Sequence, residues 1–223
     1  MKMKIVSAAL CSLLFTAAHA QESKWDSTYR PALYSFKVAL YESYPHARKD
    51  IVFLGNSITD RVDWNELLGM RQVRNRGISG DITFGVLQRL NEVIQGQPSK
   101  VFILIGINDI SRNIPDSLIL ENYRKMIQRI RSGSPRTKIF FQTLLPVNNT
   151  FTQFRNHYNK DAHILWLNDQ IRAFSGQQGV QVIDLYPHFL DRDGKLDARY
   201  TEDGLHLNAE GYKVWAKLLR EVL

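Results

Sequence analysis

The sequence predicts an α/β protein with three layers: a doubly wound, flavodoxin-like parallel sheet of five strands between two layers of helices. Short runs of residues, most of them wholly apolar, recur along the chain, as expected for strands that helices cover on both faces. Each run is followed by a stretch in which apolar residues return every three or four positions, as in a helix. This alternation is typical of doubly wound parallel sheets. The expected strands are residues 51–54, 72–75, 101–105, 138–145 and 180–185.

Residues 1–20 are expected to lie outside this domain, as a secretory signal peptide. Lys2 and Lys4 precede an apolar run that ends in Ala18-His19-Ala20, which is a small-x-small cleavage pattern. The run is shorter than the roughly 20 apolar residues that a membrane span needs, although a retained N-terminal anchor is the alternative. We therefore expect an exported protein, periplasmic or extracellular, that has no stable membrane anchor after cleavage near Ala20.

Composition indicates an ordinary globular domain. The chain has 223 residues, of which 44% are hydrophobic and 23% are charged. Its one cysteine, Cys11, lies in the predicted signal peptide, so the mature chain can hold no disulfide and must be stabilised by an apolar core. Without the two lysines of that peptide, the 29 basic and 22 acidic residues leave a net charge of +5. The basic residues are scattered without an aromatic stripe, so nucleic-acid binding is not expected.

Residues 21–47 are predicted to be an N-terminal helical segment that packs on the domain of residues 48–223. Its helix is expected to begin near Pro31 and to pack through Leu33, Phe36, Leu40 and Tyr44, which stand at helical spacing. The last helix is expected to begin with Asn208 as its N-cap. The other expected helices reach from the first strand to residue 68 and cover residues 82–94, 118–130 and 164–174.

Polar and glycine residues follow three of the predicted strands. Asn56 and Ser57 come after the first strand, Gly77 and Gly80 after the second, and Asn108 after the third. The carboxyl ends of parallel strands meet at one edge of the sheet, where ligands bind. Each feature also has a purely structural interpretation: Ser57 as a helix cap, the glycines as loop residues, and Asn108 as part of a turn.

Near the C-terminus, Asp203 and His206 supply the partners that a catalytic serine needs. A serine hydroxyl is a weak nucleophile until a base takes its proton, and histidine has a suitable pKa near neutrality. An aspartate orients the histidine and stabilises its charged form. By itself, an Asp-x-x-His pair also occurs by chance in surface turns. Preorganised donors must meet the oxyanion, and the Gly77 amide and the Asn108 side chain are candidates.

Four motifs stand in order: Gly-Asn-Ser at 55–57, Gly77, Gly-x-Asn-Asp at 106–109 and Asp-Gly-Leu-His at 203–206. Together they resemble the SGNH/GDSL hydrolase superfamily, from about residue 48 to the end of the chain. The resemblance implies a serine esterase that forms an acyl-enzyme. The roles that it implies are Ser57 as nucleophile, Asp203 and His206 as acid and base, and Ser57, Gly77 and Asn108 as oxyanion-hole donors.

The substrate is predicted less directly. The segments 185–189 and 193–196 make the chain similar to the acetylhydrolase-type branch of sialate or glycan O-acetylesterases. This similarity implies release of short acyl groups, above all acetyl, from O-acetylated carbohydrates such as sialic acids. No stretch resembles a long apolar lid, which also favours a short acyl group. A lysophospholipase or a thioesterase with the same triad is the alternative.

Three residues are candidates for contact with the substrate. Asn56 precedes the serine, in place of the aspartate that is usual in the family. Arg76 can meet an anionic group or form a structural salt bridge. Phe154 lies in the long connection 146–160, which either rims the cleft or packs as a small helix on the core.

Other classes of function are weakly supported. No cofactor is expected, and the remaining histidines show no metal-ligand spacing, so no metal site is predicted. A flavin-binding module would need a phosphate loop richer in Ser and Thr than residues 55–59. A non-catalytic ligand-binding protein could dispense with Ser57 or His206, and this chain keeps both. The isolated histidines are His46, His157, His163 and His188.

Overall fold

The structure is a computed structural model that describes residues 25–175 and 179–223, so the predicted signal peptide lies outside it. Five parallel strands form one sheet in the order β2-β1-β3-β4-β5. This is the flavodoxin-like order, and the predicted fold class is confirmed. The strands are β1 (Ile51–Gly55), β2 (Val73–Gly77), β3 (Lys100–Leu104), β4 (Lys138–Gln142) and β5 (Val180–Ile183).

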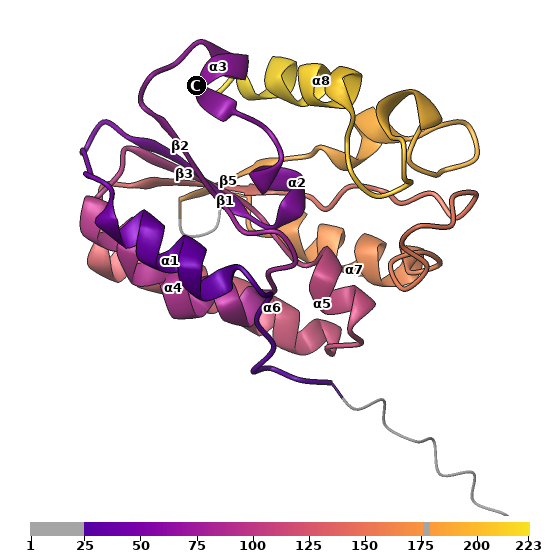
Figure 1. The fold of residues 1–223 in the computed structure, drawn as a ribbon, viewed down its shortest axis with the longest axis horizontal. Helices are drawn as coiled ribbons and strands as arrows, with labels where there is room; N and C mark the ends of the chain where they lie inside the picture. The colour runs from indigo at the N-terminus through magenta and orange to yellow at the C-terminus, as the bar shows by residue number, and fades with distance from the viewer. Residues whose placement is uncertain (1–24, 176–178) are drawn as a thin grey trace, which may run out of the picture.

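Helices cover both faces of the sheet (Figure 1). One face carries α3 (Trp64–Leu68) and α8 (Ala209–Leu219). The short helix α2 (Ser57–Asp60) follows β1 directly, and two 3-10 turns, η1 (Tyr186–Phe189) and η2 (Ala198–Tyr200), lie between β5 and α8. Within the described residues, no helix is long and apolar enough to cross a membrane. The other face carries α1 (Tyr34–Ser43), α4 (Thr83–Gly96), α5 (Ile107–Ser111), α6 (Asp116–Gly133) and α7 (Asp161–Arg172).

An aromatic row ties the α3 and α8 layer to the sheet. Phe53, Phe102 and Phe140 stand in register on β1, β3 and β4, and their rings stack at 4.8 and 4.5 Å between centroids. Trp64 of α3 stacks on Phe53 at 4.4 Å, and Trp215 of α8 meets Trp64 edge-on at 4.7 Å. Because each large aromatic side chain buries about 150–250 Å², this row fixes both helices over the strands that lead into the site.

Helix α1 packs through a different face from the predicted one. Leu33 and Phe36, two of the expected contact residues, are 61% and 63% exposed, whereas Tyr34 and Tyr41 are buried with Val38 against them. The two tyrosine hydroxyls donate to backbone carbonyls of α4 and β2, at 2.7 and 2.6 Å. The buried face therefore satisfies polar groups that a purely apolar face would leave without partners.

Element boundaries differ from the sequence expectation at β4, which ends at Gln142 rather than at residue 145. At the C-terminal end the predicted cap is present, because Asn208 Oδ1 accepts a hydrogen bond from the Gly211 amide at 3.1 Å.

Candidate active site

Ser57 stands where β1 passes into α2, and glycines at the ends of two strands let that helix sit against the sheet. A Cβ at Gly55 would lie 2.4 Å from the Leu104 carbonyl oxygen, and one at Gly77 would lie 2.4 Å from the Asp60 amide nitrogen. No larger residue fits without moving backbone. The helix is capped by Asn56, whose Oδ1 accepts from the Ile58 amide at 3.0 Å.

Helices on the α3 and α8 face hold α2 in place. Trp64 Nε1 donates to the Thr59 carbonyl at 2.9 Å, and the Tyr212 hydroxyl of α8 donates to the Ile58 carbonyl at 2.7 Å. The backbone that carries Ser57 is therefore fixed before any substrate arrives. The Ser57 amide itself has no acceptor among the residues that the structure describes.

Ser57, His206 and Asp203 form one chain of hydrogen bonds. Ser57 Oγ lies 2.9 Å from His206 Nε2, and His206 Nδ1 lies 2.8 Å from Asp203 Oδ2. The other carboxylate oxygen, Oδ1, accepts from the amides of Leu205 at 3.0 Å and of His206 at 2.8 Å. The structure thus brings together a serine and a histidine that are 149 positions apart, at the distance that proton transfer requires.

The surroundings of His206 and Asp203 set the charge states of both side chains. Burial lowers the pKa of His206 below its usual 6.5, and Arg61 lowers it further, although Asp203 opposes both effects. Burial raises the pKa of the Asp203 carboxyl, but the hydrogen bonds from His206 and Leu205 outweigh burial and lower it overall. At neutral pH the imidazole is therefore neutral and able to accept a proton, and the carboxylate is charged.

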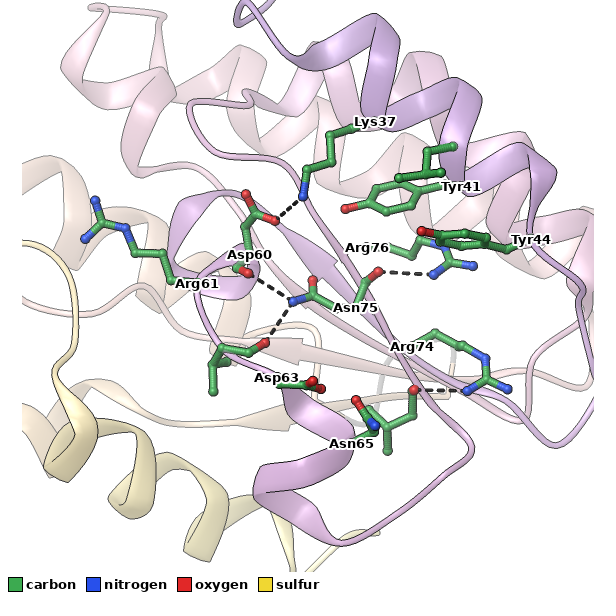
Figure 2. Close-up of a pocket in the computed structure, with 13 residues that line it drawn as sticks. Lys37, Tyr41, Tyr44, Asp60, Arg61, Asp63, Asn65, Arg74, Asn75 and Arg76 are labelled. Carbon is green, nitrogen blue, oxygen red and sulfur yellow. Dashed lines mark hydrogen bonds and ion pairs between the residues drawn. The ribbon is translucent and has the colours of Figure 1, made fainter.

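Arg61, at the end of α2, contacts Asp203 and also lines a neighbouring cavity. Its Nη1 lies 3.5 Å from Asp203 Oδ2, and its side chain is 46% exposed. The cavity, of about 510 Å³, lies beside the edge strand β2, between α1 and α3 (Figure 2).

The predicted role of Gly77 is wrong, because its amide is already in use. The Gly77 amide donates to Asn75 Oδ1 at 2.8 Å, and Gly77 is needed for the close approach of α2. Gly80 offers a free amide instead: its φ is +83°, and its amide has no acceptor among the described residues. The next residue, Asp81, accepts a hydrogen bond through its carbonyl oxygen from Asn108 Nδ2 at 2.9 Å. The residue that follows Gly80 therefore contacts Asn108.

Ser79 ties this glycine loop to α2. Its amide and its hydroxyl donate to Asp60 Oδ2 at 3.2 and 2.8 Å. The loop is thus held between α2, which carries Ser57, and Asn108. These contacts bring three potential donors to one region: the amides of Ser57 and Gly80 and the side chain of Asn108.

His157, which the sequence left isolated, belongs to the site. Its Nε2 lies 3.0 Å from Asn108 Oδ1. Burial lowers the pKa of His157 to about 4, and the charges of Arg112 and of His206 when protonated add to this effect. No spacing in the sequence signals this contact, since the two residues are 49 positions apart.

The connection 146–160 rims the site and contains no helix, so the alternative of a small packed helix is wrong. Phe154 is half-buried, and its ring meets the His206 ring edge-on at 4.9 Å and the His157 ring at 5.8 Å. The Asn148 amide donates to the Gly204 carbonyl at 2.8 Å, and the Tyr158 hydroxyl donates to a carbonyl of the same turn. The connection therefore supports the turn that carries the acid and covers the histidine.

Two of the predicted substrate contacts are wrong. Asn56 is completely buried and serves as the cap of α2. Arg76 is 3% exposed, donates through Nε to Glu92 Oε1 at 2.7 Å, and lies over the rings of Tyr41 and Tyr44. Figure 2 shows this arginine against the two tyrosines on the α1 side of the cavity. The structural salt bridge is therefore the correct interpretation of Arg76.

Within residues 25–175 and 179–223, no three His, Cys, Asp or Glu side chains are grouped as metal ligands. The arrangement instead offers a nucleophile, a neutral base, a charged acid and several amide donors. It is the type of site that serine hydrolases use on unrelated folds.

Comparison with known proteins agrees with this class. The sequence profile of the GDSL-like Lipase/Acylhydrolase family matches residues 53–214. The chain belongs to this family and is a carboxylic ester hydrolase, so the predicted SGNH/GDSL resemblance is confirmed.

Relatives with names and structures support the assignment. The chain is 27% identical to the human platelet-activating factor acetylhydrolase IB subunit alpha2 over 180 residues, which cover 78% of this chain and 76% of the relative. A solved structure from Streptococcus pneumonia is 30% identical, with a TM-score of 0.76, and the match covers 84% of this chain and 91% of that one. The lipase/acylhydrolase from Enterococcus faecalis is 29% identical, with a TM-score of 0.64 and coverage of 78% and 95%.

Proposed function

We propose that the protein hydrolyses short acyl esters, above all acetyl esters, through an acyl-enzyme on Ser57. The observation that carries this proposal is the unbroken hydrogen-bond chain from Ser57 through His206 to Asp203. As Ser57 Oγ attacks the ester carbonyl, His206 Nε2 takes its proton and Asp203 stabilises the resulting imidazolium. His206 then returns the proton to the leaving alcohol. Water, activated by the same histidine, releases the acid and restores the serine.

The negative oxygen of the tetrahedral intermediate needs preorganised donors. We assign this role to the amides of Ser57 and Gly80 and to the side chain of Asn108. Both amides lack an acceptor among the described residues, and Asn108 Nδ2 has a second hydrogen beyond the one that it donates to Asp81. Gly80 thus replaces Gly77 in the predicted set.

The tight surroundings of the serine favour a small acyl group. Ser57, His206 and Asn108 are 8%, 4% and 7% exposed, and Phe154 closes over the histidine ring. An acetyl group fits such a site better than a fatty chain. The relatives named as acetylhydrolases of platelet-activating factor support the same acyl group.

We propose that the alcohol part of the ester is a carbohydrate, so that the substrate is an O-acetylated carbohydrate such as an acetylated sialic acid. Acetylated phospholipids, suggested by the names of the relatives, and lysophospholipids or thioesters are the alternatives. Sialic acids carry a carboxylate and phospholipids a phosphate, so a cation near the site favours both. Arg112 supplies one: its amide donates to the Asn108 carbonyl at 3.2 Å, its guanidinium lies 3.2 Å from the Tyr29 ring centroid, and no acid pairs with it among the described residues.

The first experiment tests the nucleophile. Wild type and Ser57→Ala are compared on p-nitrophenyl acetate, with the melting temperature measured for both. We expect the variant to keep the fold and to lose hydrolysis. Unchanged turnover in a folded Ser57→Ala protein would rule out the proposed mechanism.

The second experiment identifies the substrate. Release of acetate is measured from a panel of O-acetylated sugars and from an acetylated phospholipid, and release of fatty acid from a lysophospholipid. Arg112→Ala should lower kcat/KM for the anionic substrates about tenfold, the loss expected for one exposed charge-assisted contact, and leave p-nitrophenyl acetate unchanged. The matched control is Arg124→Ala, an exposed arginine of α6 that lies near Val180 at the amino end of β5. Fatty acid without acetate would favour the lysophospholipase.

Export is part of the proposal. Residues 1–20 carry the basic start, apolar run and cleavage pattern of a signal peptide. The N-terminal sequence of the protein recovered from its native host tests this. A start near Gln21 agrees with export, and an intact Met1 in a cytoplasmic fraction contradicts it.

A further inference from the structure

The geometry points to His157 as a positioning residue, which locks the side-chain amide of Asn108 so that its NH2 group faces the developing oxyanion. The inference rests on the proposed function and adds a residue that the triad and the oxyanion donors do not include. It is carried by the direct contact between His157 Nε2 and Asn108 Oδ1 at 3.0 Å.

The chemistry of the partners fixes the direction of each hydrogen bond. The Asp81 carbonyl oxygen can only accept, so the Asn108 atom that lies 2.9 Å from it must be the nitrogen. The other terminal atom of Asn108 is therefore the oxygen, and it faces His157. Because a carbonyl oxygen can only accept, His157 Nε2 must carry a hydrogen.

This pairing prevents the amide from turning over. Rotation of the Asn108 amide by 180° would place its oxygen against the Asp81 carbonyl and its NH2 against the N–H of His157. The bond to Asp81 would be lost, the bond to His157 would survive only if the ring hydrogen moved from Nε2 to Nδ1, and a lone pair would face the oxyanion in place of a donor. In the orientation that His157 and Asp81 select, one hydrogen of Nδ2 meets Asp81, and the second has no acceptor within the described part of the chain. That second hydrogen is the one available to the intermediate.

The same contact suits a neutral histidine. Burial, the nearby His206 and Arg112 hold the pKa of His157 at about 4, so the ring is uncharged at neutral pH. The charged groups around it are Arg112, His206 when protonated, and Asp203, whose negative charge favours the protonated ring. A neutral ring supplies the hydrogen bond without placing a second positive charge beside the imidazolium that forms on His206.

Phe154 holds the ring of His157 in place. The His157 amide donates to the Phe154 carbonyl at 2.8 Å, and the two rings meet edge-on at 5.8 Å. Since Phe154 also meets His206 at 4.9 Å, one loop sets both the catalytic histidine and the residue that orients Asn108.

The experiment compares His157→Gln with His157→Met on p-nitrophenyl acetate. Glutamine can bring an N–H to the position of Nε2, whereas methionine keeps much of the volume and donates nothing. Because loss of an oxyanion donor costs about 10²- to 10³-fold in kcat, we expect His157→Met to lower kcat about tenfold or more with KM nearly unchanged. His157→Gln should stay within about threefold of wild type, as expected when the donor is retained. His163→Met, at an exposed histidine paired with Asp116, is the matched control and should not change kcat.

A double-mutant cycle separates positioning from general support of the fold. In an Asn108→Ala background, His157→Met should cause no further loss, because the amide that it orients is gone. Additive losses, equal losses in the Gln and Met variants, or a change in KM alone would overturn the inference, and so would full activity of His157→Met. None of these results bears on the nucleophile, which Ser57→Ala tests separately.

Discussion

Asp203→Asn is the sharpest test of how the triad works, since it changes one atom and leaves the turn in place. Asp203 Oδ1 accepts from two backbone amides, and an asparagine oxygen can keep both bonds. The position of Oδ2 becomes an NH2 group, 2.8 Å from His206 Nδ1. Nδ1 must then accept, so the hydrogen of the neutral ring moves to Nε2. His206 faces Ser57 with a donor and can no longer take its proton.

The expected loss is large in rate and small in stability. In triads of this type the change lowers kcat by about 10⁴-fold, which corresponds to about 5 kcal/mol of transition-state stabilisation. The folded state loses the contact with Arg61, which is 3.5 Å long and lies at a half-exposed side chain. Contacts of this kind contribute about 0–1 kcal/mol, so the melting temperature should fall by no more than about 4 °C.

The assay is the initial rate of p-nitrophenyl acetate hydrolysis at neutral pH, with Ser57→Ala as the baseline and a thermal melt of every variant. Asp197→Asn is the matched control. It stands in the same connection, and its carboxylate is paired with Arg199 rather than with His206. Its rate should equal that of wild type.

Two results would refute the reasoning. A folded Asp203→Asn enzyme with a rate within tenfold of wild type would mean that His206 keeps its working tautomer without the acid. A loss of rate that tracks a fall in melting temperature of 10 °C or more would mean that Asp203 serves the turn rather than the histidine.

Two further predictions concern pH. Because the pKa of His206 lies below 6.5, kcat/KM should stay constant from neutral pH down to a pH below 6.5 and then fall as the imidazole gains a proton. Arg61 lowers this pKa, so Arg61→Gln should move the fall to higher pH. An unchanged pH profile would contradict the role of Arg61. Burial raises the pKa of Asp109 from 3.8 to about 7, so between these pH values the folded protein holds a proton that the unfolded chain releases. The free energy of unfolding should therefore decrease as the pH rises from about 4 to about 7, by up to about 4 kcal/mol. Asp109→Asn should flatten this dependence in urea titrations, and an unchanged slope would contradict it.

The difference between Gly77 and Gly80 shows where sequence reasoning stops. Gly77 ends β2 and Gly80 comes three positions later, and both suit a backbone that approaches a ligand. Only the folded neighbours separate them: Asn75 occupies the Gly77 amide, and α2 fills the space beside it. Gly80 keeps a free amide among the described residues and sits beside the residue that accepts from Asn108.

His157 and helix α1 show the same limit in two other forms. His157 meets Asn108 from a connection without regular structure, and such a path has no period that a sequence can display. At α1, Leu33, just before the helix, and Phe36 compete with Tyr34 and Tyr41 for the buried face, and both sets suit a helical spacing. Tyr34 and Tyr41 lie on the buried face and donate hydrogen bonds to α4 and β2, and these partners are known only in the folded chain.

The sequence by itself determined the sheet, its flanking helices and the identity of the three linked residues. Apolar periodicity depends on local geometry, and the carboxyl ends of parallel strands share one edge, so Ser57 and Asn108 had to gather there. The tertiary structure decided which amides remain free, which arginine is committed to a salt bridge, and which histidine orients Asn108. These outcomes depend on contacts between segments that are distant in sequence, because two groups form a hydrogen bond only when donor and acceptor lie about 3 Å apart.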